Sequence, residues 1–282
     1  MNKRQVEVSV ISDLHLATHA SKPKKILEYL KAIHPEILVL NGDIIDSWRF
    51  TRNYFPKNHL KVIRHFIKMM EKGTRIYYVT GNHDEFLRKF SGTKIGQLEI
   101  VNQFVFEHKG TKTWIFHGDI FDNIIHKSKG LAKFGAALYG LLTMLNKLVN
   151  TITRQFGGKE LIIYKSLKRN FAREKQAPSK FENELARSAV AQGYQTVICG
   201  HTHIPKVKIL QVGDKQINYI NCGDWVEHFT AAEFYENEWH TYTHLEFEED
   251  TQPDEYDIPA EQTIYQTLLK ELTFSNIIQP QL

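Results

Sequence analysis

Five short polar motifs occur along this chain, and each directly follows an apolar run. They are Asp13-Leu14-His15, Gly42-Asp43, Gly81-Asn82-His83-Asp84, His117-Gly118-Asp119 and Gly200-His201-Thr202-His203. A single motif of this kind is weak, because Gly-Asp turns are common. Oxygen and imidazole ligands recurring at the ends of successive strands are what a two-metal centre requires, and such a centre activates water for attack on phosphorus.

The spacing of the motifs assigns ligands to two neighbouring cations. Asp13 and His15 are two residues apart, so at an extended strand end their side chains project to the same side and can hold one cation. Asp43 offers two oxygens that can bridge both cations. The remaining expected ligands are Asn82, His117 and His201 for the second cation and His203 for the first. Because the set lacks a thiolate, we expect two divalent ions, Mn before Fe, Zn or Co, about 3.5–4 Å apart with a shared hydroxide as nucleophile.

His83 is predicted to act on the substrate and not on a metal. It directly follows Asn82, so its ring can point towards bound substrate, where it would protonate the leaving oxygen or stabilise charge on phosphorus. Asp84 is the second catalytic candidate, because it can hold the His83 ring in one tautomer. The alternative is a turn in which Asp84 caps the next helix, and both can hold. Asp46 and Asp122, with Asn82 and His83, are candidate substrate contacts.

The stretches between the polar motifs have the strands and helices expected of a layered α/β protein. Apolar runs at 6–11, 37–40, 75–79, 113–116 and 196–199 predict strands, and periodic stretches at 23–33 and 60–70 predict helices. In such a fold ligands collect at the carboxyl ends of the strands, where all five motifs fall. After His203 the chain is expected to form short antiparallel strands at 206–211, 216–221, 231–235 and 239–245.

The segment between the fourth and fifth motifs is longer than a strand-helix-strand unit needs. Residues 131–156 carry a helical apolar stripe interrupted by glycines and lysines, which favours an amphipathic helix over a membrane span, and 161–173 predict a second, basic helix. We therefore expect a single domain over 1–282, with a helical cap inserted at 120–185 and an acidic C-terminal extension at 246–282.

Charge is unevenly distributed around a net value of +4. Residues 126–180 hold twelve Lys and Arg against two Glu, which suggests a phosphate, nucleotide or lipid headgroup as partner or, alternatively, a solvated helical face. Two cysteines argue against a disulfide scaffold. The first predicted strand begins at residue 6, which leaves no room for a signal peptide. We expect a cytoplasmic protein that contacts the inner membrane peripherally through its basic cap.

The motifs resemble those of the calcineurin-type metallophosphoesterases, whose order is D-x-H, G-D, G-N-H-D, H-G-D or G-H-x, and G-H-x-H. The resemblance runs from Asp13 to His203. It implies a four-layer α/β/β/α sandwich with two mixed β-sheets and His83 as the catalytic histidine, paired with Asp84. It also implies one metal held by Asp13, His15, Asp43 and His203, and a second held by Asp43, Asn82, His117 and His201.

Within that superfamily, the blocks at 42–48, 81–87 and 200–205 resemble the UDP-2,3-diacylglucosamine diphosphatases of lipid A synthesis. So does the insertion ahead of the last motif. The resemblance implies cleavage of the pyrophosphate of a UDP-linked diacyl sugar whose acyl chains lie under the cap. That group commonly has Arg at the position of His83, and the stretch 221–225 finds no place in its pattern.

Three functions are therefore compared. The first is a phosphohydrolase acting on a UDP-linked or lipid-linked substrate. A nuclease or cyclic-nucleotide phosphodiesterase ranks lower, because no basic groove interleaved with aromatic residues indicates a nucleic-acid partner. A non-catalytic binding scaffold with this fold is expected to have lost ligands, whereas all seven are present here.

Overall fold

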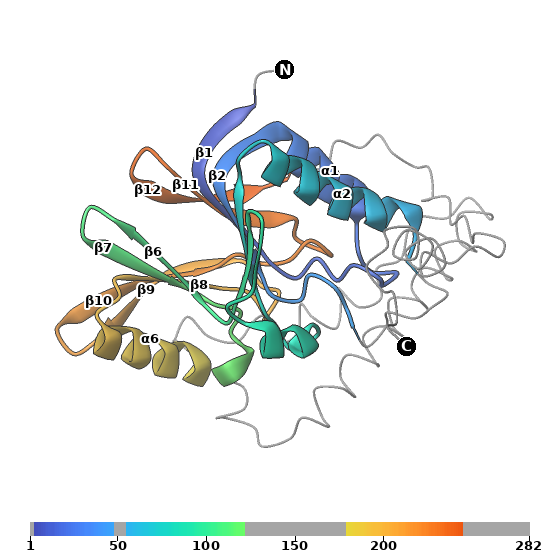
Figure 1. Ribbon diagram of the computed structural model, residues 1–282. Helices are drawn as coiled ribbons and strands as arrows, with labels where there is room; N and C mark the ends of the chain where they lie inside the picture. The colour runs from blue at the N-terminus through green and yellow to red at the C-terminus, as the bar shows by residue number, and fades with distance from the viewer. Residues whose placement is uncertain (1–2, 48–54, 122–178, 245–282) are drawn as a thin grey trace, which may run out of the picture.

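The computed structural model describes residues 3–47, 55–121 and 179–244. These residues form four layers, with helices outside two face-to-face sheets (Figure 1). The predicted α/β/β/α sandwich with two mixed sheets is confirmed. The predicted helices at 131–156 and 161–173, the candidate Asp122 and the extension at 246–282 lie outside the described residues. Among the described helices, none is both long and apolar enough to cross a membrane.

The larger sheet has the strand order β12-β11-β1-β2-β3-β5-β4. Its parallel strands are β1 (Arg4–Ile11), β2 (Ile33–Asn41), β3 (Arg75–Val79) and β5 (Leu98–Val101). Its antiparallel strands are β4 (Lys94–Ile95), β11 (Thr230–Tyr235) and β12 (Glu238–Thr243). The helices α1 (Pro23–Ala32) and α2 (Lys57–Glu71) cover its outer face, at the top of Figure 1.

The smaller sheet has the order β6-β7-β8-β10-β9. Its strands are β6 (Phe104–His108), β7 (Thr111–Ile115), β8 (Thr196–Cys199), β9 (Lys206–Val212) and β10 (Lys215–Asn221). The helix α6 (Lys180–Gln192) packs on its outer face, and the short helix η1 (Glu85–Phe90) joins β3 to β4.

The pairing after His203 differs in part from the predicted antiparallel arrangement. The hairpins β9–β10 and β11–β12 are antiparallel, as predicted, and β10 in addition pairs in parallel with β8, a pairing that the prediction did not include. The physical reason is that β10 returns to the inner position of the smaller sheet and leaves β9 at its edge. The strands between residues 94 and 108 were not predicted, since they are short and mostly half-exposed.

The continuous apolar runs arise because both faces of the central strands are covered. In β2, Leu38 and Leu40 pack towards α1 and α2, while Val39 packs between the two sheets. In β8, Ile198 faces the other sheet and Val197 faces α6. Strands buried on both faces do not show alternation of polar and apolar residues, which explains the pattern in the sequence.

Helix α6 overlaps the end of the predicted cap range, because residues 180–185 already belong to this outer layer. Its start is a capping box in which Ser179 accepts from the Glu182 backbone N–H and the Glu182 carboxylate accepts from the Ser179 N–H. The same buried carboxylate binds Lys206 at 2.8 Å and Lys208 at 3.3 Å, both on β9. Glu182 therefore ties α6 to the sheet edge.

We expect Glu182→Gln to lower the free energy of unfolding by about 1.5–3 kcal/mol at pH 7, the range for hydrogen bonds to a charged group. Although burial raises the pKa of Glu182, Lys206, the Ser179 backbone N–H and Lys208 lower it below its ordinary value. The folded-state pKa is depressed, so this stability is present above the unfolded pKa of about 4.3 and is lost as the pH falls further. Urea unfolding of the wild type and of Glu182→Gln at pH 7 and pH 3.5 measures the difference in their free energies of unfolding, which should be smaller at pH 3.5.

The matched control is Glu184→Gln on the same helix, where an exposed ion pair with Arg187 is expected to contribute less than about 0.5 kcal/mol. Equal losses in the two variants at pH 7 would contradict the assigned role of Glu182.

Candidate metal centre

The seven predicted ligands lie at one edge of the sandwich. The strands β1, β2, β3, β7 and β8 end within three residues of a motif, and β1–β2–β3 and β7–β8 are parallel sets. The carboxyl ends of both sheets therefore meet at the same edge. Ligand atoms lie within 4.8 Å of one another in three groups, Asp13-His15-His203, Asp43-His117-His201 and His15-Asp43-His83.

The first group contains the ligands expected for one cation. His203 Nε2 lies 3.3 Å from Asp13 Oδ1, and His15 Nε2 lies 3.8 Å from the same oxygen. The two imidazole Nε2 atoms are 3.3 Å apart. Burial alone would lower the pKa of His203, but Asp13 and Asp224 raise it to about 9. The carboxylates that attract this proton also attract a cation.

The second group centres on Asp43. Asp43 Oδ2 lies 3.3 Å from His117 Nε2, and Asp43 Oδ1 accepts the His83 backbone N–H at 2.8 Å. Although burial raises the pKa of Asp43, the neighbouring His117, His83 and His15 hold it well below its ordinary range. The buried carboxylate is thus ionised and lies between the two groups, as a bridging ligand requires.

Three buried polar atoms here have no hydrogen-bond partner among the described residues: Asp13 Oδ1, Asn82 Oδ1 and His117 Nε2. The His117 ring is oriented by its Nδ1, which donates to the Asn41 carbonyl at 2.9 Å, so that Nε2 faces the cluster. Buried polar atoms without a partner are rare because they are destabilising. All three belong to the expected ligand set, and a cation would satisfy each of them. The residues therefore fit a divalent metal pair.

The backbone at these ligands is strained. Five of them have φ between 47° and 64°, in the left-handed region that non-glycine residues seldom adopt: Asp13, His15, Asp43, His201 and His203. Such strain costs about 1–3 kcal/mol per residue and persists where the surrounding structure enforces it, often at functional sites. Among these residues, His201 belongs to the group of Asp43 and His117, and His203 belongs to the group of Asp13 and His15.

The glycines of the motifs allow this close approach. A Cβ at Gly81 would collide with the Asp43 carboxylate, and a Cβ at Gly200 would collide with Ser12 and the Asp13 carboxylate. His201 N–H donates to Asp13 Oδ2 at 3.0 Å, which joins the last motif to the first. The glycines directly before Asn82 and His201 are therefore packing requirements of the site.

The partner of His83 differs from the prediction. His83 Nδ1 lies 2.9 Å from the Asp46 carboxylate, and its Nε2 faces the cluster, 3.9 Å from Asp43 Oδ2. Although burial lowers the pKa of His83, Asp46 and Asp43 raise it above its ordinary value. Asp46, expected as a substrate contact, is a buried residue that orients the ring. The predicted pairing of His83 with Asp84 was wrong.

Asp84 instead organises the loop that carries the third motif. Its buried carboxylate accepts hydrogen bonds from the N–H groups of Ile44 and Gly81 and from the Tyr78 hydroxyl. Asp84 precedes η1 but makes no side-chain cap there. Burial and the nearby Asp43 raise its pKa to about 6. Because it joins the second motif to the third, Asp84 holds His83 and Asn82 in position through the backbone.

Sequence analysis missed Asp224, which follows the end of β10. Its Oδ2 accepts from His203 Nδ1 at 2.8 Å, which leaves His203 Nε2 for the cluster. Its Oδ1 accepts the backbone N–H groups of Glu227 and His228, and His228 Nδ1 lies 3.2 Å away. The available signal was a sixth polar motif at a strand end, Gly223-Asp224, in the stretch that found no place by resemblance.

We expect Asp224→Asn to weaken metal binding by about 10–100-fold, the range for loss of a carboxylate that orients a metal-bound histidine. An amide N–H facing His203 Nδ1 would favour the tautomer that places a proton on Nε2, where the cation should bind. Isothermal titration with Mn²⁺ measures the affinity, and thermal unfolding of the metal-free variant controls for folding. An unchanged affinity would rule out this role of Asp224.

The part of the chain that holds the expected metal ligands is also similar to known proteins. Residues 7–205, more than half of the chain, match the sequence profile of the calcineurin-like phosphoesterase family. The UDP-2,3-diacylglucosamine hydrolase of Aliivibrio fischeri is 27% identical over 236 residues, covering 79% of this chain and 92% of that protein. The protein of that name from Pseudomonas syringae pv. tomato is 25% identical over 234 residues, covering 77% and 88%.

Among solved structures, Vacuolar Protein Sorting 29 from Cryptosporidium parvum aligns with a TM-score of 0.38 at 13% identity, over 84% of this chain and 95% of that one. The range that matches the family profile, residues 7–205, contains all five motifs and therefore every expected metal ligand. The chain belongs to the calcineurin-like phosphoesterase family, whose members use divalent metals, and is a hydrolase.

Proposed function

We propose that this hydrolase cleaves the pyrophosphate bond of UDP-2,3-diacylglucosamine or of a related UDP-linked or lipid-linked substrate, with two Mn²⁺ ions held by the seven ligands. The observation that carries the chemistry is that three ligand atoms, Asp13 Oδ1, Asn82 Oδ1 and His117 Nε2, are buried without a hydrogen-bond partner among the described residues. The substrate is supported by the relatives named UDP-2,3-diacylglucosamine hydrolase.

The residues of the centre have two roles, metal binding and proton donation. Two divalent cations, when bound, supply an activated water and neutralise charge on the phosphoryl oxygens. Asp43, His117 and His201 would hold one of these cations, and Asp13, His15 and His203 would hold the other with Asp43. His83, held at Nδ1 by Asp46, directs Nε2 to the same space and can deliver a proton from there to the leaving oxygen. The raised pKa of His83 favours the protonated form that such a donor needs.

The location of the protein is part of this proposal. An acyl-linked substrate resides in a membrane, and the basic block at 126–180 would attract anionic lipid headgroups. We therefore propose a cytoplasmic protein in peripheral contact with the membrane, with 120–185 as a cap over the acyl chains.

The deciding experiment incubates the Mn²⁺-loaded protein with UDP-2,3-diacylglucosamine and identifies products by mass spectrometry. We expect UMP and 2,3-diacylglucosamine 1-phosphate, and no product after treatment with a chelator. Bis(4-nitrophenyl) phosphate serves as a substrate with one phosphorus. Turnover of this compound without any cleavage of the UDP-linked lipid would overturn the proposed substrate and leave the phosphoesterase chemistry in place.

A further inference from the structure

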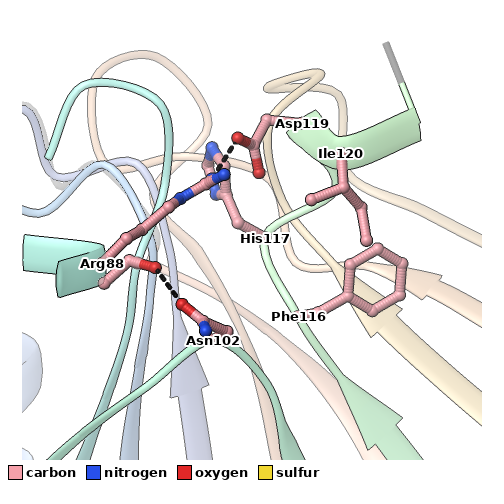
Figure 2. Close-up of a pocket in the computed structure, with 7 residues that line it drawn as sticks. Arg88, Asn102, Phe116, His117, Asp119 and Ile120 are labelled. Carbon is pink, nitrogen blue, oxygen red and sulfur yellow. Dashed lines mark hydrogen bonds and ion pairs between the residues drawn. The ribbon is translucent and has the colours of Figure 1, made fainter. Parts of the chain in front are cut away.

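A cavity of about 260 Å³ adjoins the metal centre at His117 (Figure 2). Residues at strand ends and on η1 line it: Thr80, Arg88, Asn102, Phe116, His117, Asp119 and Ile120. Ligand pockets usually measure about 300–1,000 Å³, so this cavity suits one chemical group of a larger substrate. Because His117 belongs to both, a group bound here would lie next to the phosphorus under attack.

Arg88 and Asn102 offer hydrogen-bond donors in the lining of this cavity. Arg88, on η1, reaches over to Asp119 in an ion pair beside His117, and its Nε is buried without a partner among the described residues. Asn102 accepts from the Thr80 hydroxyl at 3.2 Å through its carbonyl oxygen, so its amide N–H groups remain as donors. A guanidinium has five N–H donors in a planar fork, and Asp119 occupies only one side of it.

The buried Asp119 fixes the direction of the fork. Its side chain is 7% exposed and that of Arg88 is 29% exposed, so the pair is anchored from within while the guanidinium still reaches solvent. Phe116 and Ile120 form the apolar wall across the cavity in Figure 2. A donor fork anchored by a carboxylate beside a metal centre suits an anionic, planar or tetrahedral oxygen group, since guanidinium matches phosphate bidentately.

We propose that Arg88 is a specificity-determining residue that binds the second phosphate of a diphosphate substrate in this cavity. The proposal rests on the proposed function, because it assumes that the attacked phosphorus carries a neighbouring phosphate. In a pyrophosphate the two phosphorus atoms share one bridging oxygen, so the second phosphate must lie beside the first. The cavity at His117 is the adjoining space that offers a fixed cation for it.

The competing interpretation is that Arg88 only ties η1 to the loop after β7 through Asp119. A structural tie would affect all ligands equally, whereas a phosphate contact affects only ligands with two phosphates. UMP and UDP differ by one phosphate and are therefore the two probes. Calorimetric titration of each into the Mn²⁺-loaded protein gives two Kd values, and their ratio reports the contribution of the second phosphate.

We expect Arg88→Ala to raise the Kd of UDP at least about tenfold, the loss of one charge-assisted hydrogen bond or more, and to raise that of UMP much less. Lys89→Ala, which removes the neighbouring exposed charge, should leave the ratio of the two Kd values as in the wild type. Arg88→Lys retains the positive charge that pairs with Asp119 and therefore controls for misfolding of the alanine variant. Because lysine lacks the planar guanidinium, this variant should still raise the Kd of UDP at least about threefold.

Equal weakening of UMP and UDP in Arg88→Ala, or no weakening of UDP in either Arg88 variant, would overturn the proposal. The outcome is separable from the proposed function. If UDP-2,3-diacylglucosamine is not cleaved but Arg88→Ala changes the ratio of the UMP and UDP Kd values, Arg88 binds the second phosphate of another substrate. If the lipid is cleaved and the ratio does not shift, the role of Arg88 alone is refuted.

Discussion

Replacing His83 by alanine is expected to lower kcat by about 10²–10⁴-fold, the contribution of a positioned general acid, while both metal ions stay bound. The ring is oriented by Asp46 at Nδ1, and its Nε2 faces the cluster near Asp43. The three orphaned ligand atoms belong to other residues, so the alanine variant retains the whole ligand set. The turnover rate and the metal content of the purified variant are the two measurements.

Two further variants separate catalysis from position. Asp46→Asn should reduce kcat less than His83→Ala and shift the pH profile, because the ring stays but loses the carboxylate that raises its pKa. His65→Ala, on the outer helix α2, is the matched histidine control and should keep wild-type turnover. Full activity in His83→Ala would remove His83 from the mechanism, and loss of metal would make it a ligand.

Asp43→Asn is expected to reduce the metal content from two ions per chain to one at most and to lower metal affinity by more than about 100-fold. A loss of about 100-fold is the upper end of the range for removing a residue that only orients a metal ligand. Asp43 is expected to be a ligand itself, so its loss should weaken metal binding more. Asp43 belongs to two of the three ligand groups and lies 3.3 Å from His117 Nε2. The asparagine retains the shape but lacks the charge needed between two cations.

Metal analysis after dialysis against Mn²⁺ tests this, together with turnover. Chelator-treated wild type should regain both ions and full activity when Mn²⁺ is restored, whereas Asp43→Asn should not. Thermal unfolding of the metal-free forms controls for folding, since Asp43 also accepts the His83 N–H. Two ions and normal turnover in the variant would contradict a bridging role.

The sequence by itself determined much of the frame. The strands at 75–79 and 196–199 have the predicted bounds in the structure, because a continuous apolar run followed by a polar motif marks a buried strand and its end. The order of the five motifs also indicated the expected ligands, since parallel strands deliver their carboxyl ends to one edge. Short strands that are exposed or half-exposed, such as β4 and β6, carry no comparable pattern.

Only the tertiary structure decided how the site is supported. Asp84 adjoins His83 in sequence, yet its carboxylate accepts hydrogen bonds from Ile44, Gly81 and Tyr78. The His83 ring is oriented by Asp46, three residues after the second motif. Asp224 holds His203 from the loop that follows β10. Ligand types follow from local chemistry and from the periodicity of strands. Their partners depend on which loops the two packed sheets bring together, and on a left-handed backbone that no local pattern predicts.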